Sequence, residues 1–331
     1  MNYVLGIDQG GSKTQAVIAD ETGQILGTGK GAGACHSDAG MEAAMSAVSE
    51  AVSQACKESG IPLPRIGYVA SGLTGVDWAD EESLLHGAIS RTLEIAPERI
   101  QVVNDCIIAL RAATASPAGC ILCAGTGLNC AVRDGRGRSY AFGFYIPDKD
   151  QGGIALSRRA LQAVYDAESG MGEATALTAM VLELFSLDSV DDLLRSEVTG
   201  KLPWKTRLQL PILVEQAALR GDPVAAEMLT RFGRDEASYA VAALKRFGLD
   251  RTPVEVVLSG SVFKCRAPML LDAVKQTILA SAPQAVIIES AWEPVIGAVL
   301  LALDACSGAP AEMIQMHIKR DAQRFHMVRK T

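Results

Sequence analysis

The sequence lacks long apolar runs, and its longest, residues 295–303, falls far below the ~20 residues that a membrane-spanning helix needs. The chain starts directly on a strand-like stretch, without the basic segment and apolar core of a secretion signal. Positive charge is scarce as well, because 31 lysines and arginines stand against 38 aspartates and glutamates. We therefore expect a cytoplasmic protein whose partner is neither a membrane nor a nucleic acid.

Paired cysteines of the kind that bind metals are also lacking. The eight cysteines are scattered through apolar contexts, which is typical of reduced, buried thiols. Cys120 and Cys123 form a lone CxxC, but GCILCAG reads as a strand, in which these two positions point to opposite faces. Since no second pair completes a site, we expect neither zinc nor redox chemistry there.

Apolar residues are plentiful enough for two cores. The chain has 331 residues, 49% of them hydrophobic, which predicts two compact domains. The first half reads as strands and helices in the order β-β-β-α-β-α-β-α. The second half restarts with GCILCAGTGLNC, again a strand, a glycine turn and a returning strand, and continues through a long helical region at 154–247 that breaks near Pro203 and Pro211. This restart predicts an internal duplication whose two phosphate loops face each other across a cleft.

The first glycine turn lies in YVLGIDQGGSKTQAVIAD, between two strand-like stretches. Glycines there permit positive φ and leave backbone N–H groups uncovered, while polar neighbours add donors and one positive charge. These turn residues are Gly10, Gly11, Ser12, Lys13 and Thr14. Asp8 would repel a bound phosphate unless a divalent cation lay between them. The stretch predicts a metal–nucleotide site, although similar turns also occur in hairpins that bind nothing.

Several stretches together resemble one known family over nearly the whole length. GIDQGGSKT looks like the first phosphate motif of the acetate and sugar kinase, actin and heat-shock chaperone ATPase superfamily. AGTGLNC resembles the second phosphate motif GTGSNC, VLSGSVFK resembles the adenosine motif, and VVNDCIIAL falls where the catalytic aspartate stands. KLPWKTRLQLPILVEQAALRGDPVAAEML and WEPVIGAVLLAL are similar to family segments too. The family is that of the N-acetylglucosamine kinases and the BadF/BadG/BcrA/BcrD-type ATPases.

This resemblance implies an α/β fold of two ribonuclease H-like domains, a duplicated actin-like ATPase fold with a nucleotide cleft between them. Residues 1–116 would form the first domain, to which a C-terminal helix at 309–331 would return. Residues 117–308 would form the second domain. The resemblance also implies a homodimer, because homodimers are common among relatives.

The resemblance further implies an ATP-dependent kinase that uses Mg²⁺ and transfers a phosphoryl group to a hydroxyl of a hexose or amino sugar, N-acetylglucosamine or a glucosamine-like one. Asp8 would hold the magnesium ion through water. The nucleotide would be bound by Asp8, Gly10, Gly11, Ser12, Lys13, Thr14, Gly125, Thr126, Gly127, Gly260, Ser261 and Lys264. Asp105 would act as general base, although a strand followed by Asn104 and Asp105 also reads as an ordinary helix N-cap.

The sugar side would contain His36, Asn104, Asn129, Cys130 and Asp148. Here the sequence departs from the family. Cys35 stands where a TNH-like stretch has asparagine, which removes an amide from the sugar loop, and His36 is a candidate to replace it. Leu128 replaces the serine of GTGSNC and so removes a hydroxyl near the phosphates.

The largest departure is AFGFYIPDKDQGG, which stands where the family has GWGHLLGDEGS. We match Asp148 with the family's aspartate, so that Lys149 replaces the glutamate and Pro147 the preceding glycine. Arg158 and Arg159 follow, either facing a negatively charged acceptor or lying on the outer face of a helix. Such a rebuilt loop leaves an alternative open: an ATPase or nucleotide-binding regulator that couples domain closure to a partner protein and takes no sugar.

Overall fold

A computed structural model of the chain describes residues 2–306 and 308–328. Contacts divide the chain into two compact units. Unit 1 comprises Met1–Ile121, Ala131–Ala141 and Ile288–Thr331, and unit 2 comprises Leu122–Cys130 and Phe142–Ile287. Each unit is described by itself below.

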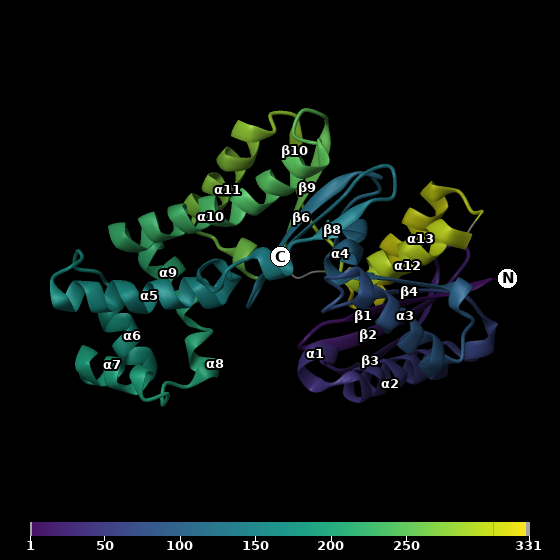
Figure 1. The fold of residues 1–331 in the computed structure, drawn as a ribbon, viewed down its shortest axis with the longest axis horizontal. Coiled ribbons are helices and arrows are strands. Elements are labelled where there is room, and N and C mark those ends of the chain that lie inside the picture. Colours follow the sequence, from purple (N-terminus) through teal and green to yellow (C-terminus); the bar gives the residue numbers. More distant parts are fainter. Residues whose placement is uncertain (1, 307, 329–331) are drawn as a thin grey trace. The chain divides into compact units, whose positions relative to one another are not determined.

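Unit 1 is built on a five-stranded sheet in the order β3-β2-β1-β4-β5 (Figure 1). The strands are β1 (Tyr3–Gln9), β2 (Lys13–Asp20), β3 (Ile25–Ala32), β4 (Ile66–Leu73) and β5 (Ile100–Asn104). The first three run antiparallel as a meander, whereas β4 pairs in parallel with both β1 and β5. The helices of this unit are α1 (His36–Ala39), α2 (Met41–Ser59), α3 (Ala79–Leu93), α4 (Asp105–Ala113), α12 (Pro294–Cys306) and α13 (Ala311–Arg324).

Helices cover both faces of this sheet. Side chains alternate between faces along a strand, and the two faces meet different helices. A Cβ on Gly29 of β3 would lie 1.9 Å from the carbonyl oxygen of Ala51 in α2, so only glycine allows this close approach. On the other face, a Cβ on Gly6 of β1 would lie 2.6 Å from the backbone of Val299 in α12. The main core of unit 1 therefore lies between the sheet and α2 and α3, and α4 and α12 cover the opposite face.

The second sheet has the strand order β10-β9-β6-β7-β8. Its strands are β6 (Gly119–Ala124), β7 (Leu128–Arg133), β8 (Ser139–Ala141), β9 (Val254–Ser259) and β10 (Ala285–Glu289). The division between the units runs through β6, β7 and β10. The lone CxxC lies in a strand as predicted, since Cys120 is fully buried in β6. No disulfide bond joins any of the cysteines in the described part of the chain.

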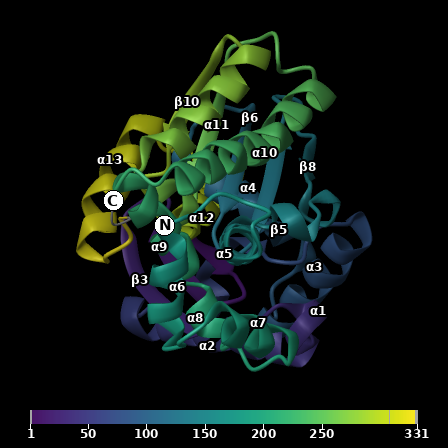
Figure 2. The same ribbon diagram turned by 90° about the vertical axis from the view of Figure 1, so that its left-hand side faces the viewer.

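Unit 2 is rich in helices, and Figure 2 shows its α10 and α11 packed along each other. They are α5 (Gly152–Ser169), α6 (Leu177–Phe185), α7 (Val190–Val198), α8 (Trp204–Arg207), α9 (Leu210–Leu219), α10 (Pro223–Phe247) and α11 (Pro268–Ser281). The predicted breaks near Pro203 and Pro211 are confirmed, because α8 begins directly after Pro203 and α9 begins at Leu210, but the region has further breaks that were not predicted. Gly170 and Ser186 end α5 and α6 in the left-handed conformation, whereas Pro211 lies in the first turn of α9, where proline is tolerated.

The contacts of α12 differ from the predicted domain boundaries, which placed this helix with residues 117–308. It packs against α4, β1 and β4 and therefore lies in unit 1. The reason is its sequence: residues 295–303 are all buried, and such a helix needs apolar neighbours on every side. Of the helices in the described part of the chain, none combines the length and apolarity needed to cross a bilayer.

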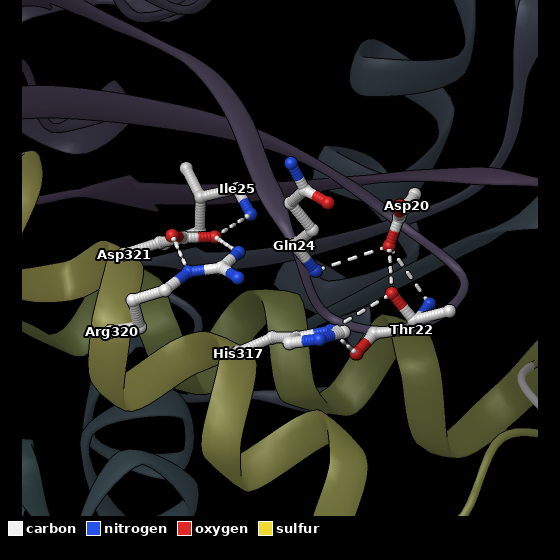
Figure 3. Close-up of polar contacts among 7 residues, drawn as sticks. All are labelled: Asp20, Thr22, Gln24, Ile25, His317, Arg320 and Asp321. Atoms are coloured by element: carbon white, nitrogen blue, oxygen red, sulfur yellow. Dashed lines mark hydrogen bonds and ion pairs between the residues drawn. The ribbon is translucent and has the colours of Figure 1, made fainter.

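Helix α13 is held on unit 1 by polar contacts with the turn between β2 and β3 (Figure 3). Asp321 is buried, and its Oδ2 accepts a hydrogen bond from the backbone N–H of Ile25 at 3.0 Å. Arg320 donates to both carboxylate oxygens of Asp321, at 2.6 and 2.9 Å. One turn earlier, His317 Nδ1 lies 3.0 Å from Oγ1 and from the carbonyl oxygen of Thr22. These contacts tie the end of the chain to its first hairpin.

We expect Asp321→Ala to lower the free energy of unfolding by about 1–3 kcal/mol, because it leaves the buried N–H of Ile25 without an acceptor. Urea denaturation at pH 7 measures the change. Glu312→Ala is the matched control, since Glu312 is exposed on the same helix and should change stability by less than about 0.5 kcal/mol. Equal stability of the two variants would contradict the docking role of Asp321.

Candidate functional site

The first glycine turn joins β1 to β2 and is closed by a hydrogen bond of 3.0 Å from Gly10 N to Lys13 O. Gly10 and Gly11 could adopt positive φ, but neither does so in this turn. A Cβ on Gly11 would meet nothing within 4 Å. The chain itself therefore does not require glycine at this position, which leaves room for a ligand to approach the backbone.

The polar side chains in and beside this turn differ in their burial and in their hydrogen-bond partners. Asp8 is buried at the end of β1. Thr14 is fully buried, and its hydroxyl donates to the carbonyl oxygen of Ala32 at 2.7 Å, so this predicted phosphate donor already serves the chain. Ser12 is exposed. Lys13 is half exposed, and its Nζ lies 2.5 Å from Oε2 of Glu293, just before α12. The turn thus offers a backbone surface and one cation.

Asn104 and Asp105 lie where β5 passes into α4. The N-cap is Asn104, whose Oδ1 accepts a hydrogen bond of 2.9 Å from Cys106 N. Its Nδ2 donates to the carbonyl oxygen of Val76 and to Oδ1 of Asp77, both at 3.0 Å. Because Asn104 is the cap, Asp105 is the first helical residue and its carboxylate is not needed to begin the helix. The alternative reading of Asp105 as the N-cap is therefore wrong.

The carboxyl of Asp105 has an unusual proton affinity. Burial and then the negative charge of Asp77 raise its pKa to about 6, while hydrogen bonds from Cys106 and Thr74 hold it down. Burial and the charge of Glu81 raise the pKa of Asp77 as well. A carboxyl with a pKa near 6 can accept a proton at neutral pH more readily than an ordinary aspartate.

Cys35 and His36 lie against the loop after β4, close to these carboxyls. The His36 side chain is 10% exposed, and its Nε2 lies 3.8 Å from Oε1 of Glu81. Its Nδ1 is buried and has no hydrogen-bond partner in the described chain. Cys35 Sγ donates weakly to the carbonyl oxygen of Thr74 at 3.8 Å. His36 is thus a buried group with one unsatisfied nitrogen, not an exposed loop histidine.

The second glycine turn, Gly125 to Gly127, joins β6 to β7 in unit 2 and is fastened to the start of α5. Gly153 N donates to the carbonyl oxygen of Gly125 at 2.8 Å, and Ile154 N donates to that of Thr126 at 3.0 Å. A Cβ on Gly125 would meet nothing within 4 Å. As in the first turn, the backbone is open to a ligand.

The loop before α5 holds two aspartates, Asp148 and Asp150, in different surroundings. The Asp148 side chain is 89% exposed and lies 3.7 Å from Arg158. Asp150 is buried and directly precedes Gln151, and Gly152 follows with a φ of +47°. A Cβ on Gly152 would lie 2.3 Å from the carbonyl oxygen of Gly127, so this position requires glycine.

Asp150 is the centre of a buried polar network that the sequence analysis missed. Its carboxylate accepts hydrogen bonds from Tyr239 at 2.8 Å and from Arg159 at 3.1 Å. Arg159 also pairs with Asp235 and lies over the ring of Phe232, so its side chain is held by other residues of unit 2. Burial raises the pKa of the neighbouring Glu236 well above its usual range. The sequence signal that could have pointed to this network is Asp150 two residues before Gly152, at a position that requires glycine.

The NC pair of the second motif lies in β7. Cys130 is fully buried, and Asn129 is partly exposed with a buried Oδ1 that has no hydrogen-bond partner in the described chain. Leu128 is buried, and its N–H donates to Oε1 of Gln151 at 3.0 Å. The leucine thus packs inward while its backbone fastens the loop. Asn129 offers an acceptor for a ligand, whereas Cys130 packs in the core.

A cavity of about 320 Å³ lies within unit 2 and includes both the second turn and the predicted adenosine motif. Ser261 and Lys264 line it as predicted. Gly260 is adjacent to the cavity and has a φ of +107°. A Cβ on Gly260 would lie only 2.1 Å from the carbonyl oxygen of Ala124, so there is no room for a side chain. Sequence reasoning missed the far wall, although its segment had been noted as family-like: Leu208, Pro211, Ile212 and Glu215. Apolar walls with a few polar groups suit a nucleoside.

The chain is similar to known proteins over most of its length. The chain is 26% identical to the N-acetylmuramic acid/N-acetylglucosamine kinase of Clostridium acetobutylicum, over 92% of this chain and 100% of that protein. It is 29% identical to the glucosamine kinase GspK of Vibrio cholerae, over 88% and 95% of the two chains.

The fold is shared with the ROK family glucokinase of Streptomyces griseus, solved with glucose and AMPPNP, at a TM-score of 0.58 and 20% identity over 92% of this chain and 99% of that one. The five-stranded sheets and helices thus form an actin-like ATPase fold. The model of the BadF/BadG/BcrA/BcrD ATPase family matches residues 5–302. The chain belongs to the BadF/BadG/BcrA/BcrD ATPase family.

Proposed function

We propose that the protein is an ATP-dependent kinase that transfers a phosphoryl group to a hydroxyl of a hexose or amino sugar, with Asp105 as the general base. The observation that carries this proposal is the state of Asp105. Asp105 is the first residue of α4, but its carboxyl group does not cap the helix. Burial and the charge of Asp77 raise the pKa of this carboxyl to about 6. The relatives named as sugar kinases support the same activity.

In this reaction the ionised carboxylate of Asp105 accepts the proton of the attacking hydroxyl, whose oxygen forms a bond to the γ-phosphorus as the bond to ADP breaks. The hydrogen bonds from Thr74 and Cys106 hold the carboxylate in place. Burial beside Asp77 makes it more basic than an exposed aspartate. Phosphoryl transfer otherwise depends on positioning, and each glycine turn by itself offers open backbone to phosphate oxygens.

The donor set around the first turn fits a magnesium ion that binds with the nucleotide. Asp8 is the carboxylate that we assign to it. In the part of the chain that the structure describes, no three His, Cys, Asp or Glu side chains gather closely enough to form a metal site of their own. Magnesium fits this arrangement, because it keeps several waters and takes its other ligands from phosphates. Bound there, it would neutralise charge on the transferred group.

The acceptor side favours a polar sugar over any particular substituent. In unit 1, His36 Nδ1 is buried and has no hydrogen-bond partner among the described residues, and the same is true of Asn129 Oδ1 in unit 2. A bound sugar hydroxyl or amide would satisfy such an atom. Cys35 in place of the family's asparagine removes one amide from this side. The acceptor is therefore to be found among free sugars, amino sugars and acetylated amino sugars.

ADP release with Mg-ATP, measured against a panel of these three sugar classes, tests the proposal. We expect one sugar to raise turnover well above the rate without acceptor. If no sugar does so while the protein still binds ATP, the kinase proposal is wrong. The protein would then be an ATPase or a nucleotide-binding regulator that couples nucleotide binding to a partner protein.

A further inference from the structure

The cavity of unit 2 has one carboxylate in an otherwise largely apolar wall. Hydrocarbon side chains from several elements line it, among them Leu156, Leu208, Ile212, Leu229 and Leu270. Of the lining residues, Glu215 is the acidic one and Lys264 the basic one. A carboxylate in such a wall needs a hydrogen-bond donor, because an unsatisfied charge is costly to desolvate.

Glu215 is held in place by the chain. Its Oε1 accepts a hydrogen bond of 2.9 Å from the backbone N–H of Arg266. Burial raises the pKa of the adjacent Cys265 thiol to about 11, and the negative charge of Glu215 contributes to this rise. Glu215 is thus an oriented anion, and an ionised carboxylate can only accept hydrogen bonds.

The position of Glu215 along α9 indicates which part of a nucleotide it faces. Pro211, in the first turn of α9, lies near Gly153, because a Cβ built on Gly153 would be 3.7 Å from the Pro211 ring. Gly153 donates its N–H to Gly125 of the second glycine turn. Glu215 follows Pro211 by four residues, about 6 Å along the helix axis. It therefore lies about one helical turn from Pro211 and lines the same cavity as the backbone that we assign to the phosphates.

An adenine nucleotide has few donors to offer at this point. Its base presents only the exocyclic amino group as a hydrogen-bond donor, at the end farthest from the phosphates. The 2′- and 3′-hydroxyl groups of its ribose lie much nearer to the phosphates. Resting on the proposed nucleotide site, we propose that Glu215 accepts hydrogen bonds from the ribose hydroxyls and so selects ribonucleotides over deoxyribonucleotides.

Binding of four nucleotides to the wild-type protein tests this proposal without any mutation. We expect the Kd of 2′-deoxy-ATP or 3′-deoxy-ATP, measured by titration calorimetry with Mg²⁺ and no sugar, to exceed that of ATP by about tenfold or more. ITP lacks the amino group of the base but keeps both ribose hydroxyls. The contact with Glu215 should therefore not raise the Kd of ITP above that of ATP. Equal binding of ATP and both deoxynucleotides would overturn the proposal.

Two variants assign the effect to Glu215. In Glu215→Ala the preference for ATP over the deoxynucleotides should fall to about onefold, and in Glu215→Gln, which keeps the shape and one acceptor oxygen, it should fall partway. Gln216→Ala is the matched control, since Gln216 is exposed on the same helix. Full discrimination in both Glu215 variants, or loss of ITP binding without loss of deoxynucleotide binding, would overturn the proposal.

The proposed function and this inference fail in different ways. A wild-type protein that binds none of the four nucleotides would disprove the nucleotide site itself, and the inference with it. A protein that binds all four nucleotides equally would keep the nucleotide site and disprove only the role of Glu215. Sugar-stimulated turnover is measured separately and does not depend on the deoxynucleotide comparison.

Discussion

Asp105→Asn is expected to lower sugar-stimulated turnover by about 10²- to 10⁴-fold while the protein still folds and binds Mg-ATP. The amide cannot take the proton of the attacking hydroxyl, but it has nearly the shape of the carboxylate. The helix should begin as before, because Asn104 and not Asp105 provides the cap. ADP release with the best sugar of the panel measures the loss, and calorimetry measures nucleotide binding.

Asp80→Asn is the matched control, since Asp80 is exposed at the start of α3 and its replacement removes the same charge from the same unit. It should keep most of the wild-type turnover.

In the wild type, kcat/KM should rise between roughly pH 5 and 7, because Asp105, with its pKa of about 6, must be ionised to act as base. Wild-type turnover in Asp105→Asn would remove Asp105 from the chemistry.

The same substitution should change stability in a pH-dependent way. The folded pKa of about 6 lies above the unfolded value of about 3.9, so the folded protein binds this proton more tightly. The stabilising contribution is therefore fully present below the unfolded pKa and is lost as the pH rises through 6. We expect Asp105→Asn to have a higher Tm than the wild type at pH 7.5 and the same Tm near pH 4. A Tm difference that does not depend on pH would contradict the raised pKa.

Two glycines of the second unit should respond to alanine in opposite ways. Gly260→Ala should lower the free energy of unfolding by on the order of 3 kcal/mol or more, because φ is +107° and the new Cβ would lie 2.1 Å from Ala124 O. Gly125→Ala should change stability by less than about 1 kcal/mol, since a Cβ there meets nothing within 4 Å. Its methyl group would instead occupy the space where phosphate oxygens approach the turn.

Urea denaturation and calorimetry with Mg-ATP, applied to both variants, separate these effects. For Gly125→Ala we expect wild-type stability and at least about tenfold weaker ATP binding, the loss of one charge-assisted hydrogen bond. Each variant serves as the control for the other, because both add one methyl group beside the same cavity. Wild-type ATP affinity in Gly125→Ala would mean that the turn does not hold phosphates.

Local sequence patterns were enough to predict the glycine turns, the strand–helix junction at Asn104 and the family. These features depend on residues close together in the chain, such as GIDQGGSKT and VVNDCIIAL, so their signal survives without tertiary structure. The same holds for the buried strand around Cys120. The adenosine motif was found in the same way, and its residues Ser261 and Lys264 line the cavity.

Other features were out of reach because they depend on contacts between distant residues. Only packing shows that Asp148 is exposed, that Asp150 is buried and that Gly152 abuts the second turn. The far wall of the cavity includes Glu215 of α9, which is distant in sequence from both the second glycine turn and the adenosine motif. The sequence shows that Gly10 and Gly11 permit positive φ, and only the structure shows that the turn closes without it.

The sequence by itself determined the α/β class, the duplicated turn motifs and the identity of the candidate base, since each is written in a short run of residues. The tertiary structure alone decided that Asn104 caps the helix, that burial beside Asp77 raises the pKa of Asp105, and that Glu215 lines the cavity. The physical reason is that proton affinity and binding depend on desolvation and on neighbouring charges. Those neighbours are brought together by packing, not by sequence order.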